Sequence, residues 1–188
     1  MIWFTADTHF FHKKLLDEDK GRSHFRSVME MNEMIILHWN RVVGQEDIVY
    51  HLGDLSFGKA EETAETVNRL LGTKILVRGN HDKRTETAYK KMGFYGVCDE
   101  AGLNIQGHVF RMAHLPYRAG QIERHAAKYG EFYTEREEGD RTKLLCGHVH
   151  GAYRRFGADI LNVGVDVWDY TPVSADQVLA EFNLKPNL

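Results

Sequence analysis

The sequence predicts a single α/β domain, because apolar runs of strand length alternate with segments of helical periodicity. Its 188 residues correspond to little more than one average domain. A globular chain of this size buries about 70% of the surface that its unfolded state exposes. The chain has two cysteines, and Cys146 stands in an apolar run where a buried, reduced thiol is expected. A hydrophobic core, without disulfides, is therefore expected to stabilise the fold.

The first half of the chain is expected to alternate strands and helices. Three apolar runs predict buried strands, at residues 2–6, 48–52 and 74–77. A helix is expected after Ser27, because Ser27 and Glu30 match a capping box. Its apolar stripe recurs at steps of three and four: Val28, Met31, Ile35, Trp39 and Val42. A second helix, over residues 59–71, is expected to end at Gly72 as a left-handed C-cap.

The second half predicts shorter elements. Beyond Lys83, a short helix and frequent glycines predict a change to short antiparallel strands, at residues 109–113, 143–146 and 160–165. Ser174 and Gln177 match the capping box of a terminal helix. The segment 118–141 is densely charged with both signs mixed. It fits either a solvated helical excursion or a lid that carries Arg118, Tyr117 and Tyr129 toward a phosphate.

The charge balance and the absence of long apolar runs narrow the function classes. The chain has 24 Lys and Arg and 27 Asp and Glu, which gives a net charge of −3. This charge is too small to indicate a patch that binds nucleic acid or a surface that binds membranes. The first seven residues lack the features of a signal peptide, and no run of about 18 apolar residues predicts a spanning helix. We therefore expect a soluble, cytoplasmic protein without a membrane partner. Eleven histidines are the unusual feature of the composition.

Side chains that can bind metals follow five of the predicted strands. They form the blocks Asp7-Thr8-His9, Gly53-Asp54, Gly79-Asn80-His81-Asp82, Ala113-His114 and Gly147-His148-Val149-His150. Ligands of open α/β sheets bind outside the carboxyl ends of the strands, so these blocks are expected to meet at one rim. Carboxylates, imidazoles and one carboxamide without a thiolate favour manganese, iron or zinc in an open site.

The spacing within the blocks has a physical interpretation. In an extended segment, residues i and i+2 point to the same side, so Asp7 with His9, and His148 with His150, are each expected to face one cavity. The glycines that precede three of the blocks permit close approach of the backbone: Gly53, Gly79 and Gly147.

The five blocks resemble the signature of the calcineurin-like metallophosphoesterases, D-x-H, G-D, G-N-H-[DE], H and G-H-x-H, in that order. The opening D-T-H-F-x-H, from Asp7 to His12, is similar to the short bacterial and phage phosphoesterases of that family. The resemblance implies a four-layer α-β-β-α sandwich with mixed sheets and helices on the outer faces. It also implies a binuclear centre of two divalent metal ions, manganese first, with iron, zinc and nickel as alternatives.

Roles follow from the resemblance position by position. One metal would be held by Asp7, His9 and His150, the other by Asn80, His114 and His148, and both by a bridging Asp54. A bridging hydroxide would attack phosphorus, and His81 would protonate the leaving group, with Asp82 fixing the tautomer of His81. His12 and Arg118 are candidate substrate contacts.

The remaining histidines are assigned to other places. His108 precedes its strand, so the ligand assignment goes to His114 at the other end. His51 is expected in the core, and His24, His38 and His125 at surface or helix positions. After the last block, Asp166 and Trp168 either border the pocket or, in the preferred interpretation, belong to a structural turn.

The second block departs from the protein Ser/Thr phosphatases. They extend it to G-D-x-x-D-R-G, whereas Leu55-Ser56-Phe57-Gly58 follows Asp54 here and supplies neither acid nor arginine. A phosphodiester or a small phosphorylated metabolite is therefore the expected substrate, with mono- and diesterase activity and the oligomeric state left open. The alternatives are a non-catalytic scaffold, which would have lost ligands, and a nuclease, for which nucleic acid would be the substrate and a basic groove is expected.

Overall fold

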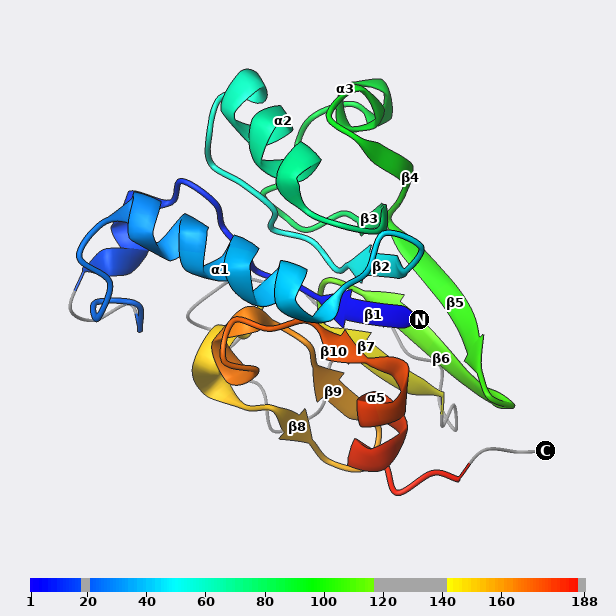
Figure 1. Ribbon diagram of the computed structural model, residues 1–188. Coiled ribbons are helices and arrows are strands. Elements are labelled where there is room, and N and C mark those ends of the chain that lie inside the picture. The colour runs from blue at the N-terminus through cyan, green and yellow to red at the C-terminus, as the bar shows by residue number, and fades with distance from the viewer. Residues whose placement is uncertain (18–20, 117–141, 186–188) are drawn as a thin grey trace.

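The computed structural model describes residues 1–17, 21–116 and 142–185 (Figure 1). It has two five-stranded mixed sheets. The first has the order β10-β1-β2-β3-β4, with β1 (Ile2–Thr5), β2 (Ile48–His51), β3 (Thr73–Val77), β4 (Phe94–Cys98) and β10 (Val173–Ser174). The second has the order β5-β6-β7-β9-β8, with β5 (Glu100–Ile105), β6 (His108–Ala113), β7 (Lys143–Cys146), β8 (Arg155–Phe156) and β9 (Ile160–Asn162). The predicted α/β fold with mixed sheets is confirmed.

Three helices cover the outer face of the first sheet: α1 (Val28–Val42), α2 (Ala60–Arg69) and α3 (Glu86–Lys91). Alternate strand residues, Trp3, Val49 and Leu76, point to this face and are buried in one apolar cluster with the stripe of α1. Met31, Ile35 and Trp39 of that stripe are buried as predicted, whereas Val28 and Val42 at its ends are partly exposed. The stripe therefore attaches α1 to the sheet through its middle turns.

The helix ends follow the expected chemistry with two differences. The Ser27 hydroxyl accepts from the Glu30 amide, but the Glu30 carboxylate accepts from the Arg26 amide and not from that of Ser27, so the capping box is half formed. Helix α2 ends at Arg69, two residues before the predicted end, and Gly72 has the expected left-handed φ of +86°.

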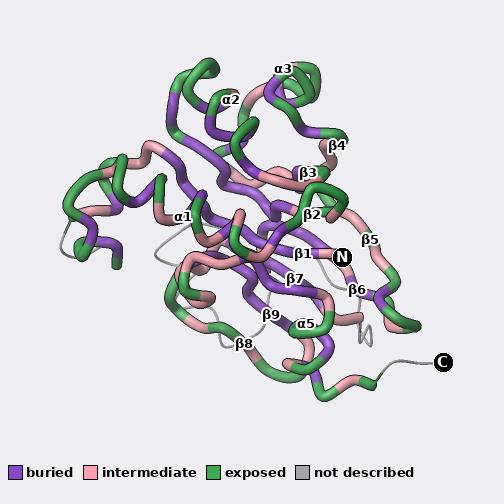
Figure 2. Tube along the Cα trace, in the orientation of Figure 1, coloured by how far each residue is buried: buried purple, intermediate pink, exposed green. Residues whose placement is uncertain are grey.

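A second apolar cluster lies between the two sheets. Phe4 and Val77 of the first sheet meet Phe110, Met112 and Leu145 of the second, and these strands form the buried centre of the molecule (Figure 2). Helix α5 (Ala175–Glu181) adds Val178 and Leu179 to the same cluster, and its C-cap residue Phe182 joins them. Its capping box of Ser174 and Gln177 is fully formed, as predicted. Cys146 is buried and free, also as predicted.

The prediction of antiparallel strands in the second half is only partly right. Strand β4 pairs parallel with β3, and β6, β7 and β9 pair parallel with one another. Antiparallel pairing in the second sheet is confined to β5 with β6 and β8 with β9. Glycine frequency does not report strand direction, and the connection from β6 to β7, over residues 114–142, is long enough for the crossover that parallel strands need.

Three short 3₁₀ helices complete the described elements: η1 (Lys13–Leu16), η2 (His150–Ala152) and η3 (Val165–Val167). The longest described helix, α1, has 15 residues, and none of the described helices has both the length and the apolar character needed to cross a bilayer. The charged segment 118–141, with Arg118, Tyr129 and His125, lies outside the described residues, as does Tyr117. Its interpretation as an excursion or a lid stays a prediction.

Candidate metal centre

The carboxyl ends of strands from both sheets bring the predicted residues to one place. Asp7 and His9 follow β1, Asp54 follows β2, and Asn80 and His81 follow β3 of the first sheet. His114 follows β6, and His148 and His150 follow β7, of the second sheet. A parallel β-bridge between Ala6 and Gly164 joins the segment after β1 to the segment after β9, directly beside the site. The parallel direction of β1–β3 and of β6 and β7 is what places all these ends at a common rim.

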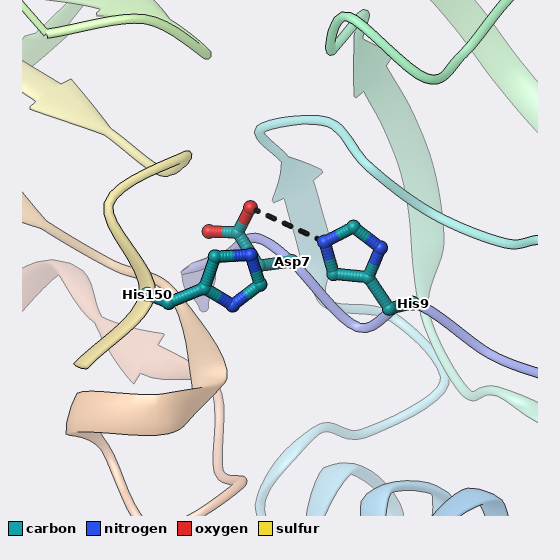
Figure 3. Close-up of side chains that lie close together, drawn as sticks. All are labelled: Asp7, His9 and His150. Carbon is teal, nitrogen blue, oxygen red and sulfur yellow. Dashed lines mark ion pairs between the residues drawn. The ribbon is translucent and has the colours of Figure 1, made fainter. Parts of the chain in front are cut away.

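Asp7, His9 and His150 form the first group, and their ligand atoms all lie within 4.8 Å of one another (Figure 3). The Asp7 Oδ1 atom is 4.0 Å from His9 Nε2. The rings of His9 and His150 stack with their centroids 4.9 Å apart. Asp7 and His9 are buried, and His150 is partly exposed. This is a compact set of one carboxylate and two imidazoles.

Asp54, His114 and His148 form the second group, again with ligand atoms within 4.8 Å of one another. The Asn80 Oδ1 atom joins them, at 2.9 Å from His114 Nε2 and 3.1 Å from His148 Nδ1. The side-chain amide therefore offers its oxygen to the same point as the two imidazoles.

A single atom of Asp54 lies between the groups. Its Oδ2 is 3.6 Å from Nε2 of His9 in the first group and 3.4 Å from Nε2 of His114 in the second. The backbone also links the groups, because the His148 amide donates to both oxygens of Asp7, at 3.1 and 2.9 Å. The two clusters are thus halves of one site.

The electrostatics of the site favour bound cations. Burial, together with His114, lowers the pKa of His148 to about 4, and burial also lowers the pKa of His9, so both imidazoles are neutral near pH 7. Burial opposes charge on His114 as well, but its hydrogen bond to Asp54 and the charge of Asp7 raise its pKa to about 9. Where carboxylates hold a proton this firmly, a divalent cation can replace it.

The residues present fit a pair of metal ions. Both ring nitrogens of His9 are buried without a hydrogen-bond partner among the described residues. Buried polar atoms are almost always paired, so these nitrogens point to a missing ligand. The surrounding donors are carboxylate and amide oxygens and imidazoles without a thiolate, a set that suits divalent manganese, iron or zinc.

Hydrogen bonds set the orientation of one imidazole in each group. His114 Nδ1 lies 2.8 Å from the Leu52 carbonyl oxygen, and His150 Nδ1 lies 2.8 Å from Asp166 Oδ2. With Nδ1 donating to these acceptors, each ring is oriented so that Nε2 is the nitrogen left to bind a metal, which would displace any proton there.

The backbone of the ligand segments is left-handed and not extended, which corrects the predicted i, i+2 geometry. Five candidate ligands have positive φ: Asp7 (56°), His9 (47°), Asp54 (58°), His148 (70°) and His150 (47°). Such residues cost about 1–3 kcal/mol each and persist where the surroundings enforce them. Gly147 shows that enforcement, because a Cβ there would lie 2.6 Å from both Ala6 Cβ and Asp7 Oδ2. The close backbone approach predicted at this glycine is confirmed.

Asp82 has a different role from the predicted one. Its Oδ2 accepts from the amides of Asp54 (2.6 Å) and Gly79 (2.8 Å), and its Oδ1 from the Leu55 amide (3.1 Å) and the Tyr89 hydroxyl (3.3 Å). These four donors occupy the buried carboxylate, so it supports the loops that carry the ligands and does not fix the His81 ring.

We expect the Asp82→Ala variant to lose about 3 kcal/mol or more of unfolding free energy, because two buried amides and one partly buried amide would lose their acceptor at about 1–3 kcal/mol each. Urea denaturation measures this loss. Asp99→Ala is the control, because the exposed Asp99–Arg78 ion pair is expected to contribute at most about 1 kcal/mol. Equal stability of the two variants would contradict this role of Asp82.

His81 lies at the mouth of the site. Its side chain is 45% exposed, its Nε2 is 3.9 Å from Asp54 Oδ2, and its amide donates to Asp54 Oδ1 at 3.0 Å. His12 stacks on the ring of the exposed Phe57 at 3.7 Å between centroids, and burial lowers the pKa of His12 to about 4. Phe57 also approaches His81, at 4.9 Å. His12, His81 and Phe57 thus form an aromatic rim beside His9.

The other histidines among the described residues lie where they were expected. His51 is fully buried, with Nε2 2.9 Å from the Thr8 hydroxyl. His108 is at the start of β6, away from the site, where it contacts the Lys185 carbonyl. His24 is exposed, and His38 is partly exposed on α1.

Sequence reasoning missed Arg22 and undervalued Asp166. Asp166 lies in the short helical turn η3, as the preferred structural interpretation expects, and it also accepts from His150 and from Arg22, so it borders the site as well. The rule of strand ends, applied to β9 as to the others, would have found Asp166. Arg22 stands in a polar stretch without periodicity, and no sequence signal marks it.

Comparison with known proteins gives matches along nearly the whole chain. A family model described as the calcineurin-like phosphoesterase superfamily domain matches residues 1–165. An uncharacterised protein of Methanocaldococcus jannaschii is 30% identical over 187 residues, covering 95% of this chain and 89% of that protein. The Gene 66 protein of Mycobacterium phage L5 is 28% identical over 198 residues, covering 94% and 91%. A solved protein of unknown function from Aquifex aeolicus shares the fold, with a TM-score of 0.69, 24% identity and coverage of 96% and 98%.

Proposed function

The chain belongs to the calcineurin-like phosphoesterase superfamily, and from this premise we propose that it hydrolyses a phosphodiester or a small phosphorylated metabolite at a pair of divalent metal ions. The observation that carries the proposal is the position of Asp54 Oδ2, 3.6 Å from His9 and 3.4 Å from His114. A carboxylate oxygen between two clusters of nitrogen and oxygen donors is suited to bridge two cations.

The proposed ligands are those of the two groups. Asp7, His9 and His150 bind one ion, Asn80, His114 and His148 bind the other, and Asp54 binds both. The distances within each group and the unpartnered nitrogens of His9 support this division. Manganese is the first candidate for both ions, with iron, zinc and nickel as alternatives.

The chemistry divides between the ions and the protein. The ions, when bound, supply Lewis acidity that lowers the pKa of water and neutralises charge on the phosphoryl group. His81 donates a proton from its imidazole to the leaving oxygen, which its exposed position at the mouth of the site supports. His12, neutral and stacked on Phe57, contributes to the substrate side of the rim. Arg118 stays a proposed substrate contact outside the described residues.

The second block supports a substrate other than a phosphoprotein. Leu55 and Ser56 are buried, and the Ser56 hydroxyl contacts that of Thr63 and accepts from the Gly58 amide. These residues serve the fold, and none presents a cation to phosphate. The proposal therefore favours diesters and small metabolites.

Metal removal tests the proposed function. Protein stripped with a chelator and then reloaded with Mn²⁺ is assayed on an aryl monoester, a linear diester, a cyclic nucleotide and a single-stranded oligonucleotide. We expect turnover of a diester or monoester by loaded protein only. We also expect the stripped protein to melt at a lower temperature, because a ligand at about 100 times its Kd adds about 2.7 kcal/mol to stability.

The other outcomes of the metal-removal experiment would contradict the proposed function or favour one of the alternative functions. Equal activity of stripped and loaded protein would exclude metal-dependent hydrolysis. Tight metal binding without turnover of any substrate would favour the scaffold, and a strong preference for the oligonucleotide would favour the nuclease.

A further inference from the structure

Arg22 is a buried cation that none of the proposed catalytic steps uses. Its side chain has no exposed surface, although it lies in the loop before α1. Its guanidinium forms two bonds to Asp166, from Nε to Oδ1 at 2.7 Å and from Nη2 to Oδ2 at 2.8 Å. It also donates to two backbone carbonyls, Thr8 O at 3.0 Å and Asp7 O at 2.6 Å. Nη1 lies 3.7 Å from the sulfur of Met31.

The oxygen acceptors of Arg22 either belong to the segment that carries Asp7 and His9 or contact His150. The carbonyls of Asp7 and Thr8 are those of the left-handed turn from which the Asp7 and His9 side chains project. Asp166 holds Nδ1 of His150 at 2.8 Å. One guanidinium thus fixes the backbone of two candidate ligands and, through a carboxylate, the ring of the third.

The imidazole rings of the second group have hydrogen-bond partners of their own. His114 is held by the Leu52 carbonyl, and the Asn80 oxygen lies between His114 and His148. No described hydrogen bond joins Arg22 or Asp166 to these residues. The support of the site is therefore asymmetric.

A contribution to folding stability does not by itself explain why the Arg22–Asp166 ion pair is buried. Burying an ion pair costs desolvation that its attraction often fails to offset, and an apolar replacement is frequently as stable. A carboxylate bonded to the remote nitrogen of a metal-binding imidazole, in contrast, fixes the tautomer and raises the basicity of the other nitrogen. Asp166 accepts two hydrogen bonds from Arg22, and its Oδ2 lies 2.8 Å from Nδ1 of His150, so its carboxylate links the guanidinium directly to the imidazole.

We propose that Arg22 and Asp166 are positioning residues that set the affinity of the first group, Asp7, His9 and His150, for its cation and leave the second group unaffected. The proposal rests on the ligand roles given under the proposed function. It makes the two metal sites separable by mutation at residues that touch neither ion.

Mn²⁺ titration of two conservative variants, Asp166→Asn and Arg22→Lys, tests this inference. Asparagine keeps the size of Asp166 but weakens the acceptor for His150, and lysine keeps the charge of Arg22 but cannot serve three acceptors from one plane. Calorimetry gives the affinity of each ion, and electron paramagnetic resonance distinguishes a coupled Mn²⁺ pair from an isolated ion. The controls are Arg69→Lys and Glu33→Gln, from an exposed two-bond pair of the same chemistry.

We expect both variants to bind one ion as the wild type does and the other about 10–100-fold more weakly. When Mn²⁺ is added at one equivalent per high-affinity site, the spectrum of each variant should be that of an isolated ion. The two control variants should keep the coupled spectrum of the wild type. If Arg22→Lys does not fold, Asp166→Asn decides alone.

The failures are distinguishable. If the wild type binds two ions and Asp166→Asn binds both with unchanged affinity, only this inference is overturned. An equal loss of affinity at both sites would also overturn it, because that result indicates general destabilisation. If the wild-type protein itself binds no pair of ions, the proposed function fails first.

Discussion

Replacing Asp54 with asparagine is expected to abolish hydrolysis and the binding of a paired metal centre. The oxygen that lies 3.6 Å from His9 and 3.4 Å from His114 would become an amide nitrogen, which cannot bind a cation. Paired cations supply several kcal/mol of transition-state stabilisation, so kcat for a diester should fall by about 10³-fold or more. Elemental analysis of the purified variant should find at most one tightly bound ion.

Asparagine is the informative replacement at this position. It tolerates the left-handed φ of 58° at Asp54, and its oxygen can still accept from the His81 amide as Oδ1 does at 3.0 Å. The fold should therefore persist, which circular dichroism and thermal melting can verify. Glu33→Gln removes an exposed carboxylate in the same way and should change neither activity nor metal content. Turnover by Asp54→Asn within tenfold of the wild type would refute the bridging role.

The second large effect is expected from His81→Ala, which should keep both ions and lose proton donation. Removing a general acid costs about 10²–10⁴-fold. The loss should depend on the ester, being severe for alkyl leaving groups, which need a proton, and small for p-nitrophenolate, which leaves as an anion. The measurement is a series of diesters with leaving groups of graded pKa, together with metal analysis.

The leaving-group series separates proton donation from a structural effect. A variant that has lost metals or structure would slow all esters alike, and that result would remove His81 from the proposed role. The control is His108→Ala, at the opposite end of β6, which should match the wild type across the series. Its imidazole contacts the Lys185 carbonyl and none of the candidate ligands.

Local patterns were sufficient to predict what depends on nearby residues. The middle of the α1 stripe, the C-terminal turn at Gly72 and the strands that precede the ligand blocks are where spacing places them. The blocks come together because the carboxyl ends of parallel strands lie at the same edge of a sheet. This inference needs only the positions of the strands in the sequence. The structure thus brings together the residues that the resemblance singles out, although their roles stay proposals.

The failures involve contacts between residues far apart in the chain. Arg22 and Asp166 are 144 residues apart, and no sequence pattern in either segment predicts that the two residues are in contact. The direction of β6, β7 and β9 depends on how long connections cross the sheet, which glycine spacing does not report. Asp82 was assigned by adjacency to His81, but its carboxylate turns to the amides of Asp54, Leu55 and Gly79.

The distribution of the ligands along the chain has a consequence for biosynthesis. Asp7 and His9 emerge early from a ribosome, whereas His150, Asp166 and the edge strand β10 are translated late. On the proposed ligand assignment, a nascent chain would expose an incomplete half-site for most of its elongation, and both ions could be bound only after His150 and Asp166 have been translated. Metal acquisition would then be a post-translational maturation step, governed by the ions available to the finished chain.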